Sequence, residues 1–175
     1  MEELTIKPVI KTDEIELIAT LAREIWTEHF TPIIGEQQVE YMLMHFQSYY
    51  AIKEQIEKQG YQYYLFLLNH ENAGYMAIQK QEKQLFLSKI YILKSFRKQK
   101  IASRAFDFLE TECQKNGLQR IWLTVNKNNI HSIEAYKKIG FTIEKPLITE
   151  IGNGFVMDDY IMERCFKTPL SQNGY

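Results

Sequence analysis

The 175-residue sequence has little that would tie it to a membrane or to a nucleic acid. No apolar run approaches the roughly 18 residues that a bilayer span needs, and the acidic start, MEELTIK, lacks the order of a secretory signal. The 21 Lys and Arg residues nearly balance the 22 Asp and Glu residues, so the net charge of -1 attracts no polyanion overall. We therefore expect a cytoplasmic protein with neither a membrane nor a nucleic acid as its partner.

Cysteine and histidine are also scarce. The two cysteines, Cys113 and Cys165, stand where apolar side chains are expected, which favours reduced, buried thiols over a disulfide. The four histidines lack the spacing of metal ligands, so we expect no metal site. There is no GxSxG elbow, Walker loop or GxGxxG fingerprint, which disfavours the hydrolase and nucleotide-binding classes that use them.

What the sequence does contain is a succession of strand and helix patterns. Helices are predicted from residue 12 or 13 to a break at residues 31–35, from residue 39 to Gly60, over residues 101–116 and over residues 130–139. The turn-like residues 69–72 predict a hairpin. Strands are predicted at residues 4–10, 61–69, 73–80, 85–92, 119–125, 141–151 and 155–163.

This order predicts an α/β sandwich with one mixed sheet. We expect a single domain over residues 1–175, with a loose tail after about residue 166. Within the fourth predicted helix, Asn129 is the expected N-cap and Gly140 the expected left-handed residue after the C-terminus. Phe141 would then fold back on Tyr136 or Ala135.

The segment SFRKQKIASRAF, residues 95–106, places four cations at the start of a predicted helix. Unpaired amides and the helix dipole favour negative charge at that position, so Arg97, Lys98, Lys100 and Arg104 need an explanation. Either solvent screens these charges, or an anion such as a phosphate completes the site. The residues by themselves leave both interpretations open.

FRKQKIA, residues 96–102, resembles the acyl-CoA pyrophosphate loop of the GNAT N-acetyltransferase superfamily. The pattern of that loop is Gln or Arg, two residues, Gly, one residue, and Gly or Ala. Arg97 and Ala102 match its ends, and Ile101 matches the apolar residue near its end. Lys100 departs from the pattern, because it stands where glycine normally lets the backbone approach the diphosphate.

LTVNKNNIHSIEAYKKIGF, residues 123–141, resembles the strand-helix unit of the same superfamily. The pattern V-N-x-x-N-x-x-A/S-I-x-x-Y-x-K-x-G-F is matched at Val125, Asn126, Asn129, Ser132, Ile133, Tyr136, Lys138, Gly140 and Phe141. The resemblance covers about residues 4–166. It implies a GNAT-like sheet of about seven mostly antiparallel strands flanked by helices, with a splayed strand pair that receives acyl-CoA.

The resemblance also implies a set of site residues. The pantetheine arm would pair with the backbone of Ile90, Tyr91 and Ile92, where one amide polarises the thioester carbonyl. Tyr136 would protonate the departing thiolate, and the side chain of Asn129 would reach the cofactor besides its role as N-cap. The pyrophosphate would lie against Arg97, Lys98, Gln99, Lys100, Ile101, Ala102 and Ser103.

The general base is open at this point. Relatives often use a glutamate on the splayed strand, but Ser88 and Lys89 stand there in this chain. Glu28 and His29 lie where the family lines its acceptor pocket, and a chain of water to a backbone carbonyl is a third alternative.

The function predicted on this basis is direct acetyl transfer from acetyl-CoA to a primary amine. EIWTEHFTPIIGEQQVEYML, residues 24–43, resembles the N-terminal part of the polyamine-acetylating branch, which favours a small amine. The alternatives are a catalytically silent acyl-CoA sensor, an N-acetyltransferase acting on proteins or peptides, and an anion-binding or nucleic-acid-binding module. A homodimer is compatible with the resemblance, because many relatives dimerise.

Overall fold

A computed structural model describes residues 3–166, which form one seven-stranded sheet in the order β1-β2-β3-β4-β5-β7-β6. Only β4 and β5 run parallel, so the predicted mixed, mostly antiparallel sheet is confirmed. The predicted loose tail after residue 166 lies outside the described residues. The strands are β1 (Leu4–Pro8), β2 (Tyr61–Leu68), β3 (Glu71–Lys80), β4 (Gln84–Ile92), β5 (Arg120–Asn126), β6 (Thr142–Gly152) and β7 (Phe155–Cys165).

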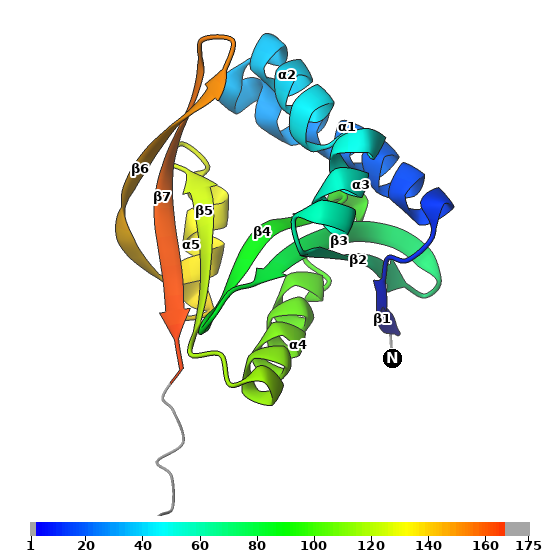
Figure 1. Ribbon diagram of the computed structural model, residues 1–175, viewed down its shortest axis with the longest axis vertical. Coiled ribbons are helices and arrows are strands. Elements are labelled where there is room, and N and C mark those ends of the chain that lie inside the picture. Colours follow the sequence, from blue (N-terminus) through cyan, green and yellow to red (C-terminus); the bar gives the residue numbers. More distant parts are fainter. Residues whose placement is uncertain (1–2, 167–175) are drawn as a thin grey trace, which may run out of the picture.

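Helices cover both faces of the sheet (Figure 1). On one face α1 (Thr12–Ile34), α2 (Glu36–Phe46) and α3 (Tyr49–Lys58) enclose a core that includes Ile18, Ile25 and Tyr75. On the other face α4 (Ile101–Asn116) and α5 (Ile130–Lys138) enclose a second core that includes Leu109 and Ile121. A short 3₁₀ helix, η1 (Lys94–Phe96), follows β4. Between residues 3 and 166, no helix has the length and apolar character that crossing a bilayer requires.

The expected break at residues 31–35 is confirmed at the last residue of that range, because α1 continues through Pro32 to Ile34 and ends before Gly35, whose φ of 85° a side chain would resist. Two other details of the predicted elements are wrong. The region up to Gly60 holds two helices, since the Ser48 hydroxyl accepts the Ala51 amide at 3.3 Å and starts α3. The β2–β3 turn is shorter than expected, because Asn69 and His70 both have positive φ, as two-residue hairpins require.

The two cysteines have different environments. Cys113 is buried in the core beneath α4, as predicted, and burial raises the pKa of its thiol to about 11. Cys165 is exposed at the end of β7, so the prediction of burial is wrong for this residue. Both thiols are free, in agreement with the expected absence of a disulfide.

The parallel pair of strands, β4 and β5, separates after a short contact (Figure 1). Pairing is confined to Gln84–Phe86 on β4 and Arg120–Trp122 on β5. At the last paired position the rings of Phe86 and Trp122 stack with centroids 4.2 Å apart. Beyond this stack, β4 has a strand partner only on its β3 side, so one edge of its backbone is open in the middle of the sheet.

The start of α1 depends on one buried carboxylate. Glu14 Oε2 accepts the amides of Ile10 and Lys11, each at 2.9 Å, and Oε1 lies 2.7 Å from Lys7 Nζ. The hydrogen bond with Lys7 and those with the two amides lower the pKa of Glu14 to about 2. The expected caps, Thr12 and Asp13, do not act here, because Lys11 is the N-cap residue.

Replacing Glu14 by Gln should therefore lower the free energy of unfolding at neutral pH by about 1–2 kcal/mol, the usual loss for a helix cap. A lowered folded-state pKa contributes stability above the ordinary value of 4.5, and this contribution fades as the pH falls toward about 2. Chemical denaturation over this pH range measures the difference. Glu16→Gln, at an exposed position of the same helix, is the control. A loss as large near pH 2 as at pH 7 would contradict the assignment.

Candidate active site

The open edge of β4 presents two backbone amides. The Leu93 amide donates to Ala73 O at 2.9 Å on the β3 side. Because successive amides of a strand point to opposite edges, those of Ile90 and Ile92 point toward β5, where no strand pairs with them. Tyr91 differs from these two: its amide faces β3, and its side chain packs in the core beneath α1. Of the three predicted backbone contacts, Ile90 and Ile92 therefore have free donors.

The loop between β4 and α4 contains two residues in the left-handed region. Lys98 has φ 65°, and Lys100 has φ 59° as the N-cap residue of α4. Lys100 thus takes the conformation for which its relatives use glycine, at a cost of about 1 kcal/mol. Left-handed residues alternating with other conformations turn consecutive amides toward one side, which forms a concavity for an anion.

Side chains of this loop divide into anchors and exposed cations. Arg97 Nε donates to Ile92 O at 3.2 Å, and Gln99 Nε2 donates to Ser95 O at 3.2 Å, so the loop is tied to the end of β4. Ile101 is buried and belongs to the core, which makes it an anchor. Lys98, Lys100 and Ser103 are exposed, and Ala102 is partly exposed.

Tyr136 is held at the end of α5 by a local motif. The Phe141 amide donates to Tyr136 O and the Gly140 amide to Lys137 O, each at 3.0 Å, and Gly140 has φ 94°. These are the two bonds of a Schellman motif, so the predicted positions of Gly140 and Phe141 are confirmed. The rings of Phe141 and Phe106 lie 5.9 and 6.2 Å from that of Tyr136. Burial raises the pKa of Tyr136 to about 12, so the phenol keeps its proton at neutral pH.

Asn129 is the N-cap residue of α5, as predicted, but its side chain makes no capping hydrogen bond. Its Oδ1 lies 3.3 Å from His29 Nε2, which brings the end of α1 to the start of α5. Burial lowers the pKa of the half-buried His29, and the charge of Arg97 adds to this effect while the Asn129 contact opposes it. His29 is therefore held as a neutral imidazole.

Glu28 and Lys89 are engaged in contacts of their own. Glu28 is exposed and its Oε1 lies 3.3 Å from Lys94 Nζ. Lys89 is buried, with Nζ 3.0 Å from Gln55 Oε1 and 3.3 Å from Ser88 Oγ. Burial lowers the pKa of Lys89 to about 7. A β-bulge beside Ser88 turns Lys89 toward α3, so the strand position that carries glutamate in many relatives offers no carboxylate here.

Asp159 is a residue of this region that the sequence patterns did not single out. It lies on β7 opposite Asn126, it is 6% exposed, and its Oδ1 has no hydrogen-bond partner among residues 3–166. Burial and the neighbouring Asp158 raise the pKa of Asp159 to about 6, while the charge of Lys127 opposes them. One signal was available: Asp159 lies between Met157 and Ile161 on one face of a predicted strand, where an apolar residue is expected.

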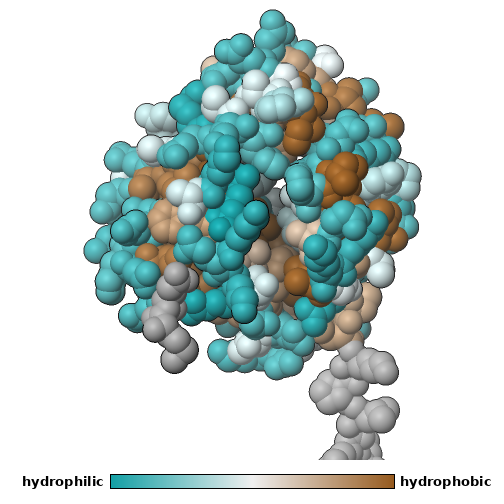
Figure 2. All heavy atoms as spheres, turned by 180° about the vertical axis from the view of Figure 1, so that it is seen from behind, coloured by the Kyte–Doolittle hydropathy of each residue, from teal (hydrophilic) through white to brown (hydrophobic). Residues whose placement is uncertain are grey.

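Two hydrogen bonds join α2 to the β6–β7 hairpin on the face of the sheet that α1 covers, which is the acceptor side of the molecule in the terms of the resemblance. The Tyr41 hydroxyl donates to Ile151 O at 2.7 Å, and Gln38 Nε2 donates to Val156 O at 2.9 Å. A Cβ on Gly152 would lie 2.3 Å from the Tyr41 hydroxyl, so this contact requires glycine. From behind, the molecule shows a narrow hollow near the centre, with apolar residues inside and polar residues around it (Figure 2).

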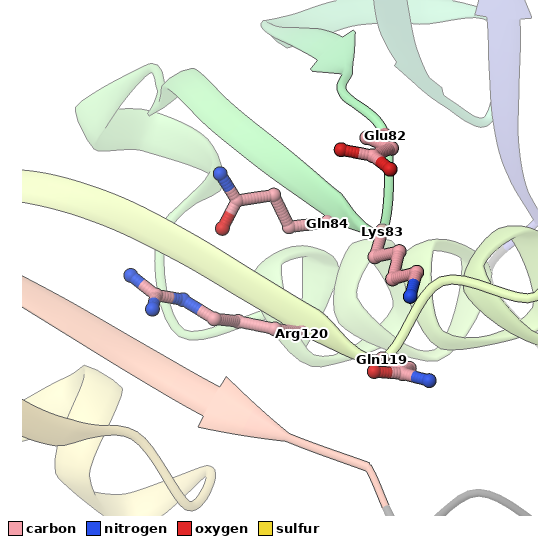
Figure 3. Close-up of a pocket in the computed structure, with 5 residues that line it drawn as sticks. All are labelled: Glu82, Lys83, Gln84, Gln119 and Arg120. Carbon is pink, nitrogen blue, oxygen red and sulfur yellow. The ribbon is translucent and has the colours of Figure 1, made fainter.

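Figure 3 shows a different, polar hollow of about 360 Å³ at the paired ends of β4 and β5. Its lining includes Arg120, whose guanidinium lies 2.9 Å from Glu144 Oε2 and 3.0 Å from Glu163 Oε2. The guanidinium charge is balanced by these two carboxylates, and β4 and β5 are paired there, so this hollow differs from the open edge of β4. Within the described part of the chain, no three His, Cys, Asp or Glu side chains are grouped to hold a metal ion.

Comparison with solved structures finds the same fold. PaiA N-acetyltransferase from Thermoplasma acidophilum, in complex with coenzyme A, is 20% identical with a TM-score of 0.77, over 94% of this chain and 99% of that chain. The ribosomal-protein-S18-alanine N-acetyltransferase from Escherichia coli is 18% identical with a TM-score of 0.68, over 99% of both chains. A GNAT-family acetyltransferase from Streptococcus pneumoniae is 25% identical with a TM-score of 0.62, over 94% of this chain and 100% of that chain.

The sequence model of the acetyltransferase (GNAT) family matches residues 19–141. This range includes the open edge of β4, the loop with the two left-handed lysines and the helix that carries Tyr136. Since the match spans well over half of the sequence, the chain belongs to the acetyltransferase (GNAT) family.

Proposed function

We propose that the chain acetylates the primary amine of a small cationic molecule of the polyamine class, in the cytoplasm, by direct transfer. As a member of its family, the chain is an N-acetyltransferase that uses acetyl-CoA as the acetyl donor. The observation that carries the proposal is the open edge of β4, which leads into the loop with the two left-handed lysines and packs against the same core as Tyr136.

The residues present fit acetyl-CoA. A diphosphate matches the amides that Lys98 and Lys100 turn to one side, together with the exposed ammonium groups of the same two residues. The pantetheine arm carries amide groups, which match the unpaired donors of Ile90 and Ile92. Acetyl-CoA supplies an activated acetyl thioester when bound. One of the two strand amides would then stabilise the negative charge that develops on the carbonyl oxygen.

Tyr136 acts in this proposal as a proton relay. With a pKa of about 12, its phenol is a weaker acid than a thiol, so it does not protonate the sulfur in isolation. Transfer becomes favourable when the nitrogen of the acceptor returns a proton to the phenol oxygen in the same step. The contacts with Phe106 and Phe141 hold the ring in place for this exchange.

The acceptor side favours a small substrate. Two hydrogen bonds tie α2 to the β6–β7 hairpin on this side, which favours a compact acceptor over an extended chain. Trp26 and Phe30 are buried and pack against Tyr91 with ring centroids 5.6 and 6.0 Å away, so they support this side from within the core. The resemblance of residues 24–43 to the polyamine-acetylating branch favours a polyamine as the acceptor.

A protein N-terminus is the second candidate acceptor, because the similar E. coli enzyme acts on the alanine of a ribosomal protein. A silent acyl-CoA sensor is the third. Release of coenzyme A measured against polyamines, aminoglycosides, amino acids and peptides distinguishes these alternatives. Turnover with polyamines supports the proposal, turnover confined to peptides favours the second candidate, and binding of acetyl-CoA without turnover favours the third.

Tyr136→Phe should lower kcat by about 100-fold or more, the usual contribution of a proton-transferring group. The KM for acetyl-CoA should stay within about twofold, because the ring and its packing remain. Steady-state kinetics with the best acceptor of the panel measures both values. Tyr64→Phe, which removes the hydroxyl group of a partly buried tyrosine on β2, is the matched control. An unchanged kcat in Tyr136→Phe would remove this residue from the mechanism.

Lys100→Gly and Lys100→Gln separate the conformation of the loop from its charge. Both variants should bind acetyl-CoA more weakly and with a smaller dependence on salt, because each loses one ammonium group near the diphosphate. Only Lys100→Gly should unfold at a higher temperature, because it relieves the left-handed backbone of position 100. Calorimetry at two salt concentrations and thermal unfolding test this, with Lys115→Gln near the end of α4 as the control. Unchanged affinity and salt dependence would place the diphosphate elsewhere.

A further inference from the structure

Asp159 Oδ1 is the only buried carboxylate oxygen without a hydrogen-bond partner among residues 3–166. Within the part of the chain that the structure describes, no ion pair compensates this carboxylate either, since Lys127 Nζ lies against Asp158, 2.5 Å from its Oδ1. An unpaired buried carboxylate is costly, so a chain keeps one where its chemistry is used. In this protein it lies beside the active-site opening and not in either closed core.

The position of Asp159 follows from the sheet. It pairs with Asn126 at the end of β5 that has separated from β4. Along β7 it shares a face with Met157, which packs against the core beneath α1, so Asp159 lies on the acceptor side of the sheet. Burial raises the pKa of the Tyr91 phenol on β4, and electrostatic interactions with Tyr136 and with Asp159 add to this rise. Asp159 and Tyr136 are thus both within electrostatic reach of one residue at the splayed edge.

We propose that Asp159 is the general base of the reaction, taking a proton from the acceptor ammonium directly or through one water molecule. This inference rests on the proposed function, since it assigns a role within acetyl transfer to an amine. A carboxylate also attracts the cationic acceptor before it removes the proton. The raised pKa of Asp159, about 6, leaves it ionised at neutral pH and basic enough to accept a proton.

His29 is already engaged at this site. Its Nε2 contacts Asn129, and burial together with the positive charge of Arg97 lowers the pKa of its ring. The charged and titratable groups around Asp159 are Asp158 and Lys127 beside it, Tyr91 on β4 and, through Tyr91, Tyr136 on α5. Among these, only Asp159 is both anionic at neutral pH and unpaired.

The protons balance in this scheme. The acceptor nitrogen uses its lone pair to form a bond to the acetyl carbon. The carbon–sulfur bond breaks, and the electron pair of that bond goes to sulfur. The ammonium nitrogen loses two protons. Asp159 takes the first and passes it to solvent, and the second replaces the proton that Tyr136 gives to sulfur. One proton is released for each acetyl group transferred.

The test compares the pH dependence of kcat/KM in wild type, Asp159→Asn and Asp158→Asn, with the best amine of the panel. Wild type should lose activity below about pH 6 as Asp159 gains a proton. Asp159→Asn should lose this acidic limb, and its kcat/KM at neutral pH should be about 100-fold lower than that of wild type. Its kcat/KM should recover as the pH approaches the pKa of the amine, about 10, because the neutral acceptor needs no base. Asp158→Asn should keep its activity with the limb shifted to lower pH, because a neighbouring negative charge is removed.

Stability supplies a second readout. Because the folded pKa of Asp159 lies above the ordinary value of 3.8, wild type should lose stability as the pH rises from about 4 to about 6. Asp159→Asn should lack this loss and unfold at a higher temperature at neutral pH, so a drop in its activity cannot be attributed to misfolding.

The outcomes separate the two proposals. Absence of turnover by wild type with every amine defeats the proposed function itself. Turnover by wild type, with the acidic limb and kcat/KM retained in Asp159→Asn, overturns only the role of Asp159. A rise in KM with the acidic limb unchanged also overturns it, because this shows a group that attracts the acceptor without taking its proton.

Discussion

The separation of β4 from β5 is the constraint on which the rest of the structure depends. Backbone amides inside a sheet normally have partners, and leaving them without partners is unfavourable. Here the pairing ends at the stacked rings of Phe86 and Trp122, so the amides of Ile90 and Ile92 are left for a ligand. The opening is maintained because each half of the sheet has its own support. β4 is paired with β3, and β5 is paired with β7.

Glycine allows the close approach on one side of this opening. A Cβ on Gly74 would lie 2.1 Å from the carbonyl oxygen of Tyr91, so β3 packs against β4 at a distance that no side chain permits. On the other side, the Schellman motif at Gly140 fixes the end of α5 and with it Tyr136. The two walls of the site are therefore set by local backbone geometry, and the side chains act from fixed positions.

Features encoded over a few neighbouring residues could be predicted from the sequence. The succession of strands and helices along the chain and the end of α5 at Gly140 depend on short motifs. Asp159 could not be predicted in this way, because its burial results from the pairing of β7 with β5 over 30 residues away. The direction of Lys89 likewise depends on a bulge against β3. The capping role expected of the Asn129 side chain failed for the same reason, since His29 arrives from a helix 100 residues earlier.

The net charge of -1 conceals a separation of charge across the site. Cations gather on the loop before α4, whereas an unpaired carboxylate lies on β7 on the acceptor side. This arrangement suits a donor that carries phosphates and an acceptor that carries ammonium groups, because each is attracted to its own side. Both features reduce stability, through the left-handed backbone of Lys100 and the buried charge of Asp159. A fold that only had to be stable would use glycine at position 100 and an apolar residue at position 159, so the chain retains an unfavourable group at each of the two positions to which the proposals assign binding and proton transfer.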